Sequence, residues 1–220
     1  MYQHKTSDGQ VIDLPVTRAV CIGRNYLDHI AELNNAVPDE ALFFMKPAPA
    51  LCDMSQPVTT PDNLGECHNE LELAVLLNKT LKNASEEDVL AAIEGYGLAL
   101  DLTLRDVQSK LKSQGYPWER AKSFDGSCPL SGFVPASTFS DPADIHFTLH
   151  INGEMKQQGH TAKMIRPLLA LIAEMSRVFT LTPGDVILTG TPKGVGPLVA
   201  GDKIEAILEG GLTVTSRVEA

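Results

Sequence analysis

The chain has 220 residues, of which 43% are hydrophobic and 21% are charged, and its formal net charge is -10. This size and composition are typical of a soluble globular protein with one sizeable core, so we expect a single domain over residues 1–220. The acidic balance argues against nucleic acid and anionic membrane as partners, because both bind clustered lysine and arginine, and no apolar run approaches the ~18 residues of a membrane helix.

Short apolar runs bounded by glycine or proline predict the strands of the first half of the chain. They cover residues 16–22, 42–45, 70–77 and 97–102. Ser85, with Asp88 three residues later, indicates the start of a helix, and Gly95 is expected to end it. A second helix is expected after residue 102, where Thr103 and Asp106 have the same cap spacing.

The second half of the chain adds a hairpin, a helix and further short strands. Residues 145–151 alternate between apolar and polar side chains, which predicts a half-buried antiparallel strand, and Asn152-Gly153 predicts a hairpin turn. Residues 163–179 form the best amphipathic pattern, provided that Pro167 lies in the first turn. A buried strand over residues 186–189 then enters a loop rich in Gly and Pro. This order favours an α+β protein with mixed sheets over a doubly wound fold.

The N-terminus and the cysteines indicate the compartment. The first ten residues, MYQHKTSDGQ, are polar and lack the basic and then apolar order of a signal peptide. The four cysteines are scattered and form no C-x-x-C motif, which favours free thiols over zinc or a disulfide framework. We therefore expect a cytoplasmic protein.

Two acids stand close together in the run HNELEL at residues 68–73. In a strand, alternate side chains share a face, so His68, Glu70 and Glu72 would point the same way, with the two carboxylates ~6–7 Å apart. Such a pair repels unless a positive group lies between its members. This run alone is equally compatible with an exposed edge strand whose acids are solvated.

Asp101 strengthens the case for a metal. It is an isolated acid in the apolar run GYGLALDLTL, where burying an unpaired carboxylate is costly. Three carboxylate donors suit a hard cation such as Mg2+ or Mn2+ and would leave positions for substrate and water. The sequence therefore predicts a catalytic metal site formed by Glu70, Glu72 and Asp101.

A general base and several cations complete the candidate site. If the residues from Asp28 onward are helical, His29 and Glu32 are i,i+3 neighbours, so Glu32 can orient the imidazole, although such pairs are also common on helix surfaces. The loop beginning with Gly190 and Thr191 offers N–H groups and a hydroxyl that suit a carboxylate. The other candidates for substrate binding or catalysis are Arg24, Lys46, Arg105, Gln108 and Lys122. Each of them alone is also compatible with a position on the protein surface.

Seven segments of the chain, taken together and in order, resemble the fumarylacetoacetate hydrolase family. They are CIGRNYLDHIAE, LFFMKP, HNELELAVLL, GYGLALDLTLRDVQ, PWERAKSFDGSCPLSGF, INGEMKQQG and GDVILTGTPKGVGP. They are most similar to the compact acylpyruvase and oxaloacetate decarboxylase branch. The resemblance implies a mixed β-sandwich roll, a homodimer, Mg2+ or Mn2+ at the three carboxylates, and a mobile lid that carries His29 and Glu32.

The residues and the resemblance together predict a hydrolase that cleaves a C–C bond in acylpyruvate-type 2,4-diketo acids, with the developing enolate stabilised by the metal. His29, oriented by Glu32, would deprotonate the attacking water, and Lys122, with Lys46 or Gln108, would stabilise the oxyanion. The residues expected to bind the small 2-oxo acid are Arg24, Lys46, Arg105, Gln108, Gly190 and Thr191. Decarboxylation or keto–enol tautomerisation of oxaloacetate at the same site is the alternative. A scaffold without activity is disfavoured because every catalytic group is present, and a redox enzyme because no dinucleotide fingerprint exists.

Overall fold

A mixed sheet of eight strands forms the centre of the fold in a computed structural model that describes residues 2–61 and 64–219. Along its main path the strands are β2 (Leu42–Pro47), β1 (Arg18–Gly23), β13 (Val186–Leu188), β6 (Leu71–Leu77), β7 (Ile93–Leu100), β9 (Cys128–Leu130) and β3 (Leu51–Asp53), and β10 (Val134–Pro135) pairs with β7. Two pairs, β1 with β13 and β3 with β9, are parallel, and the others are antiparallel.

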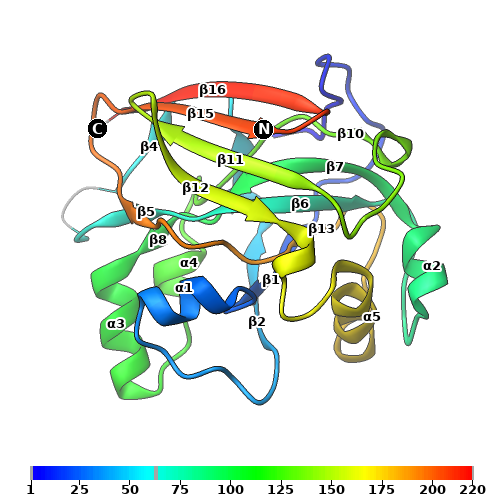
Figure 1. The fold of residues 1–220 in the computed structure, drawn as a ribbon, viewed down its shortest axis with the longest axis horizontal. Helices are drawn as coiled ribbons and strands as arrows, with labels where there is room; N and C mark the ends of the chain where they lie inside the picture. Colours follow the sequence, from blue (N-terminus) through cyan, green and yellow to red (C-terminus); the bar gives the residue numbers. More distant parts are fainter. Residues whose placement is uncertain (1, 62–63, 220) are drawn as a thin grey trace.

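Two smaller sheets accompany the large one. The five-stranded sheet contains β12 (Glu154–His160), β11 (His146–Ile151), β15 (Lys203–Leu208), β16 (Leu212–Glu219) and β4 (Val58–Thr59). The three-stranded sheet contains β14 (Gly196–Pro197), β5 (Cys67–Asn69) and β8 (Thr103–Leu104). In Figure 1 the five-stranded sheet lies above β6 and β7, and the helices lie below.

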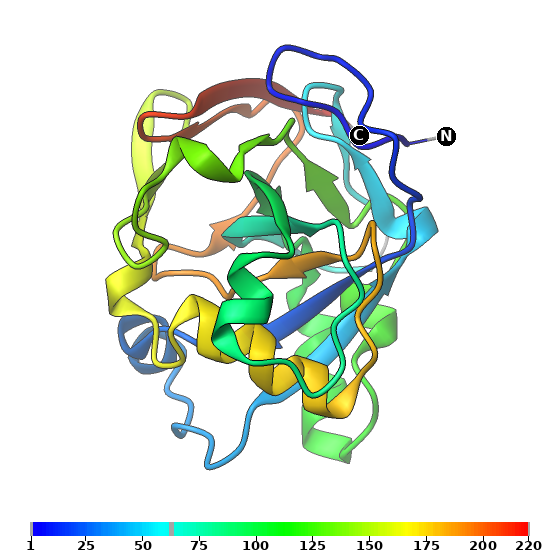
Figure 2. The same cartoon turned by 90° about the vertical axis from the view of Figure 1, so that its right-hand side faces the viewer.

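The helices are short. They are α1 (Leu27–Glu32), α2 (Glu86–Leu90), α3 (Arg105–Gln114), α4 (Glu119–Lys122) and α5 (Leu168–Val178), with 3-10 turns η1 (Ala48–Ala50), η2 (Ala136–Thr138) and η3 (Thr161–Lys163). Helices α1, α3 and α4 gather at one end of the molecule, while α2 and α5 pack against each other at the other end (Figures 1 and 2). The fold is therefore α+β with mixed, curled sheets, which confirms the predicted fold class.

The main core lies between the large sheet and the five-stranded sheet. Leu71, Leu73 and Val75 of β6 belong to the same buried cluster as Phe147 and Leu149 of β11. The intervening β6 residues face a second cluster, whose members include Ala19, Ala74, Leu76, Phe133 and Leu188. Because both faces of β6 are covered, its sequence is apolar at every position except Glu72, instead of alternating.

Two local predictions are confirmed by hydrogen bonds and backbone angles. Ser85 and Asp88 form a reciprocal capping box at the start of α2, with Ser85 Oγ accepting the Asp88 N–H at 3.2 Å. Asn152 and Gly153 join β11 to β12 with φ values of 55° and 80°. Both angles are positive, as a two-residue hairpin turn requires.

Three predicted helix boundaries are wrong. Gly95 does not end α2 but lies inside β7, where a Cβ atom would meet the Val134 carbonyl oxygen at 2.3 Å. Thr103 does not cap α3, because its hydroxyl donates to the Asp101 carbonyl oxygen at 2.9 Å. The helix expected from residue 163 begins only at Leu168, after Pro167 in an extended conformation.

The state of the cysteines and the lengths of the helices can also be compared with the sequence predictions. Cys21, Cys67 and Cys128 are buried, Cys52 is half-buried, and all four are free thiols, as predicted. Within residues 2–61 and 64–219, the helices are too short or too polar to cross a membrane.

Candidate metal and substrate site

Glu70 occupies a break between two strands. β5 ends at Asn69 and β6 begins at Leu71, and the two strands belong to different sheets. The buried Gln157 amide bridges the break, because its Oε1 accepts the Leu71 N–H at 2.8 Å and the Asn69 side-chain amide at 2.9 Å. The strand predicted over residues 70–77 is confirmed to within one residue by β6, but the strand period assumed for residues 68–73 is interrupted at Glu70.

His68 lies outside the pocket that the three carboxylates line. Its Nε2 lies 3.0 Å from Glu66 Oε2, and Arg105 Nε donates to its Nδ1 at 3.4 Å. His68 therefore does not join Glu70 and Glu72 in the pocket, although it was expected on their face, and Arg105 contacts both His68 and Glu70. The change of sheet at residue 70 interrupts the two-residue period on which that expectation depended.

Glu70, Glu72 and Asp101 nevertheless converge. Each offers a carboxylate oxygen within 4.8 Å of those of the other two. Their exposed fractions are only 5%, 1% and 1%. An edge strand with solvated acids is therefore ruled out, and three buried carboxylates require compensation by positive charge.

Two cations of the pocket wall supply part of that charge. Lys122 Nζ donates to Glu70 Oε2 at 2.7 Å and to Asp101 Oδ2 at 2.6 Å, and Arg105 pairs with the other oxygen of Glu70. Burial opposes ionisation of Glu70, but Lys122 and Arg105 outweigh it and hold the pKa of Glu70 well below its usual range. Burial likewise opposes the charge on Lys122, yet Asp101 and Glu70 raise the pKa of Lys122 above its usual value.

Lys46 lies behind Asp101 instead of in the pocket. Its ammonium is fully buried and lies 2.8 Å from Asp101 Oδ1. Its hydrogen bonds go to the carbonyl oxygens of Leu102, Lys122 and Ser127. Lys46 is therefore held against Asp101 and does not line the pocket in which its direct contact with a substrate was predicted.

The carboxylates retain capacity for a divalent ion. Glu72 forms no ion pair within the described residues and accepts a hydrogen bond from the Gly190 N–H. Burial and the neighbouring Asp101 raise its pKa well above the usual value. Asp101 is also buried, but its Oδ1 faces the Lys46 ammonium and its Oδ2 faces that of Lys122. Three converging buried carboxylates, one of which has no ion pair within the described residues, fit a hard ion such as Mg2+ or Mn2+.

Helix α1 places a histidine beside the carboxylates. The His29 ring is only 6% exposed, and its Nδ1 lies 3.4 Å from Glu32 Oε2. The other Glu32 oxygen accepts the Gly194 N–H at 2.9 Å, which ties this helix to the loop after β13. Burial lowers the pKa of His29 more than Glu70 and Glu32 raise it. The imidazole is therefore neutral near pH 7 and able to accept a proton.

Gly190 and Thr191 are engaged with the protein itself. Gly190 has φ of 94°, and a Cβ atom there would lie 2.7 Å from the Asn25 side chain, so only glycine lets its N–H approach Glu72. The Thr191 hydroxyl donates to the Leu71 carbonyl oxygen at 2.8 Å. Both residues thus position Glu72 and the start of β6, and their predicted contact with a substrate carboxylate requires these bonds to be exchanged.

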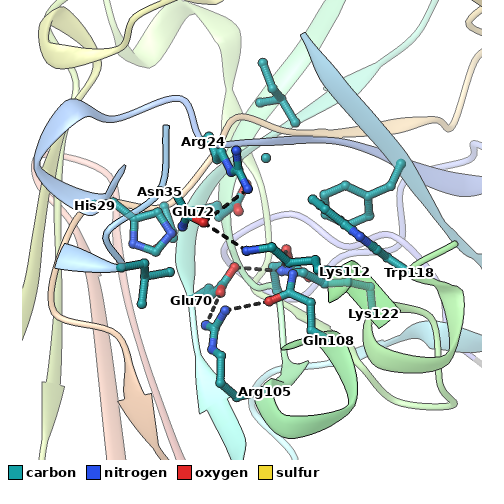
Figure 3. A pocket seen from close by; sticks show the side chains of 16 residues that line it. Arg24, His29, Asn35, Glu70, Glu72, Arg105, Gln108, Lys112, Trp118 and Lys122 are labelled. Atoms are coloured by element: carbon teal, nitrogen blue, oxygen red, sulfur yellow. Dashed lines mark hydrogen bonds and ion pairs between the residues drawn. The ribbon is translucent and has the colours of Figure 1, made fainter. Parts of the chain in front are cut away.

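Most of the predicted site residues line one pocket (Figure 3). The predicted residues in its wall are Arg24, His29, Glu70, Glu72, Asp101, Arg105, Gln108, Lys122 and Thr191. Glu32, Lys46 and Gly190 stand behind the wall, in contact with His29, Asp101 and Glu72 respectively. The Arg105 guanidinium also donates to Gln108 Oε1 at 2.7 Å, so these two side chains share one face of α3.

Sequence reasoning missed part of the wall. Asn35, Phe44, Lys112 and Trp118 also line the pocket. Only Lys112 has a usable signal, because it follows Gln108 by four residues and therefore continues the helix face that carries Arg105 and Gln108. The positions of the other three residues in the pocket wall depend on how separate segments of the chain pack together, which no local sequence pattern reveals.

A second group of metal-type side chains lies outside this pocket. The His146 and His160 rings, on the paired strands β11 and β12, stack with centroids 3.9 Å apart, and Asp144 Oδ1 lies 3.3 Å and 3.0 Å from their Nε2 atoms. The three residues are partly or largely exposed. Any count of metal ions bound by this protein must therefore separate the two groups.

Comparison with known proteins gives one family. The fumarylacetoacetate (FAA) hydrolase C-terminal family matches residues 18–219. Oxaloacetate tautomerase YcgM of Escherichia coli is 54% identical over 99% of this chain and 100% of its own length, and the human mitochondrial oxaloacetate tautomerase FAHD1 is 44% identical over 91% and 90%. The crystal structure of fumarylpyruvate hydrolase from Pseudomonas aeruginosa, in complex with Mn2+ and pyruvate, superposes with a TM-score of 0.92 at 31% identity, covering 99% of this chain and 95% of that one. The chain therefore belongs to the fumarylacetoacetate hydrolase family and is an enzyme of that family.

Proposed function

We propose that this member of the fumarylacetoacetate hydrolase family is a divalent-metal-dependent tautomerase that interconverts the keto and enol forms of oxaloacetate. The observation that carries the proposal is the presence, in one pocket, of a neutral buried histidine and three converging carboxylates. The names of relatives at 54% and 44% identity favour oxaloacetate as substrate and tautomerisation as reaction.

Glu70, Glu72 and Asp101 would hold the divalent ion. When bound, such an ion supplies Lewis-acid stabilisation of the negative charge that develops on the 2-oxo oxygen. Lys122, whose ammonium contacts two of these acids, keeps further positive charge at the same end of the pocket.

His29 would move the proton. Conversion of keto to enol breaks a C–H bond at C3 and forms an O–H bond at the C2 oxygen, so a proton is taken at one atom and delivered at the other without a change of net charge. The neutral imidazole accepts the C3 proton and then returns it to the C2 oxygen, while Glu32, 3.4 Å from Nδ1, orients the ring and stabilises its charged form. Burial of His29 excludes water that would otherwise compete for the ring.

Hydrolysis of acylpyruvates, the reaction that the sequence put first, is the second candidate and has less support. It rests on the likeness at 31% identity to a structure of fumarylpyruvate hydrolase with Mn2+ and pyruvate. The His29–Glu32 pair also suits deprotonation of a water molecule. Decarboxylation of oxaloacetate requires the same metal chemistry without an attacking water.

The test is the rate at which enol oxaloacetate loses its ultraviolet absorbance. We expect the enzyme with Mg2+ or Mn2+ to accelerate ketonisation far beyond the metal alone, and EDTA to abolish the acceleration. His29→Asn should lower kcat/KM by about 10²–10⁴-fold, the usual contribution of a general base, while metal binding persists. If the wild-type enzyme ketonises oxaloacetate no faster than free metal but hydrolyses acylpyruvates, tautomerisation is wrong and the second candidate stands.

Metal binding is tested separately by calorimetry. Glu70→Gln should abolish metal binding at the pocket. The comparison is made between His146→Ala and the double variant His146→Ala/Glu70→Gln, because His146→Ala removes the exposed Asp144–His146–His160 group. His146→Ala alone serves as the control and should keep full activity. Unchanged metal affinity in Glu70→Gln would contradict the assignment of the carboxylates.

A further inference from the structure

Two cations in the pocket wall have no acidic partner. Arg24 and Lys112 line the pocket, and within residues 2–61 and 64–219 neither forms an ion pair. Arg24 donates to the Ala36 carbonyl oxygen at 3.2 Å and to Asn35 Oδ1 at 3.1 Å, and Lys112 Nζ donates to the same Asn35 Oδ1 at 2.9 Å. By contrast, Arg105 and Lys122 are each paired with Glu70.

The arrangement brings two like charges to one neutral oxygen. Figure 3 shows the side chains of Arg24 and Lys112 both reaching Asn35. Burial, and then the charges of Arg24 and Arg105, lower the pKa of Lys112, so the positive groups repel one another. An anion bound between Arg24 and Lys112 would relieve this repulsion.

The backbone also holds Arg24 in an unfavourable conformation. Its φ is 61°, in the left-handed region that non-glycine residues seldom occupy. It directly follows β1, and this conformation carries its guanidinium toward residues 35 and 36. Such strain persists where the surrounding structure fixes it, and functional sites are the usual location.

The chemistry of the pair selects a carboxylate. A guanidinium presents a planar fork of donors and an ammonium presents three more, and both form their strongest hydrogen bonds with carboxylate oxygens. The acids Glu70, Glu72 and Asp101 lie in the same pocket and are suited to a metal and the 2-oxo end of a substrate. A second carboxylate, at the other end of a short substrate, then remains to be neutralised.

We propose that Arg24 and Lys112, with Asn35 between them, form a subsite for the distal carboxylate of a short dicarboxylic 2-oxo acid. The subsite makes the pocket selective for dicarboxylates over 2-oxo acids with an uncharged tail. This inference rests on the proposed function for the position of the 2-oxo end. Of its three residues, the sequence pointed to Arg24 alone.

The test compares oxaloacetate, which has the distal carboxylate, with pyruvate, which lacks it. Calorimetry with Mg2+ in the cold gives both dissociation constants without relying on turnover. In the wild-type protein, oxaloacetate should bind more tightly than pyruvate. Arg24→Met and Lys112→Met should each weaken oxaloacetate about tenfold or more, the effect of losing a hydrogen bond to a charged group, and leave pyruvate unchanged.

Two further variants sharpen the test. Asn35→Asp is nearly isosteric and places a carboxylate between the two cations, so it should also weaken oxaloacetate while sparing pyruvate. Lys110→Met removes a lysine from the exposed side of the same helix, outside the pocket, and should change neither constant.

The outcomes separate this inference from the proposed function. Equal losses for oxaloacetate and pyruvate, or an unchanged oxaloacetate constant in Arg24→Met and Lys112→Met, would overturn the subsite. A wild-type protein that prefers oxaloacetate through these residues but does not ketonise it would keep the subsite and refute the tautomerase.

Discussion

Lys122 offers a direct test of the charge balance at the carboxylates. Lys122→Met keeps a long apolar stem but removes the ammonium that contacts Glu70 at 2.7 Å and Asp101 at 2.6 Å. Removing one partner of a buried ion pair costs about 3–5 kcal/mol, because the remaining charges stay buried. At about 2–4 °C per kcal/mol for a chain of this size, the melting temperature in EDTA should fall by about 6–20 °C.

Mg2+ should reverse much of this loss. An ion that binds only the folded protein stabilises it by about 2.7 kcal/mol when its concentration is a hundred times Kd. In the wild-type protein the Lys122 ammonium already occupies two of the carboxylates and competes with the ion. Lys122→Met lacks this competition, so Mg2+ should raise its melting temperature by more than it raises that of the wild-type protein.

Calorimetric melts in EDTA and in Mg2+ measure both effects. Lys156→Met is the matched control, because that ammonium is exposed and its partner Glu154 lies on the same strand. It should stay within about 0.5 kcal/mol of the wild-type protein. Equal melting of Lys122→Met and wild type in EDTA, or an equal rise with Mg2+ in both, would refute the idea that ammonium and ion share the carboxylates.

Two predictions concern the histidine and its support. The pKa of His29 is lowered and the neutral ring is the active form, so kcat/KM should fall only below pH ~6.5. Because Glu32 raises that pKa, Glu32→Gln should move this fall in kcat/KM to lower pH. A shift of the fall to higher pH would contradict the role given to Glu32. Gly194→Ala should cost more stability than Gly201→Ala and also lower kcat. Both glycines have positive φ, but only at Gly194 would a Cβ meet a carbonyl oxygen, that of Lys156 at 1.8 Å; equal losses of stability in melts would refute the clash.

The three acids could be found from sequence because of their energetics. Glu72 and Asp101 stand in apolar runs, and an acid there is either paired or bound to an ion, whatever the details of the fold. The identity of each partner could not be found in this way. Lys122 reaches Glu70 across 52 positions, and Gln157 bridges the strand break across more than 80. Such contacts follow from how the sheets curl, which no local pattern encodes.

The errors in the predicted elements have one common source. Gly95 and Thr103 have the local appearance of a helix stop and a helix cap. In the fold, Gly95 admits a neighbouring strand and the Thr103 hydroxyl turns back to the Asp101 carbonyl. A glycine or a hydroxyl residue in the sequence indicates a position where the fold requires a small or polar side chain. That requirement can arise at a helix end, but it can also arise where two strands approach closely or where a side chain bonds to the backbone. The capping box at Ser85 was reliable because two reciprocal bonds depend on one spacing.

The distribution of charge, more than its sum, determines which anions this protein can bind. The chain has 18 lysines and arginines against 28 acids, which disfavours extended polyanions. Yet Arg24, Arg105, Lys112 and Lys122 all line one pocket. Exposed charges are screened beyond about 8 Å at physiological salt, so a small substrate responds to these nearby groups and not to the distant acids. With Lys122 and Arg105 committed to Glu70, the surplus charge lies at Arg24 and Lys112. A short dianion can therefore be bound by a strongly acidic chain.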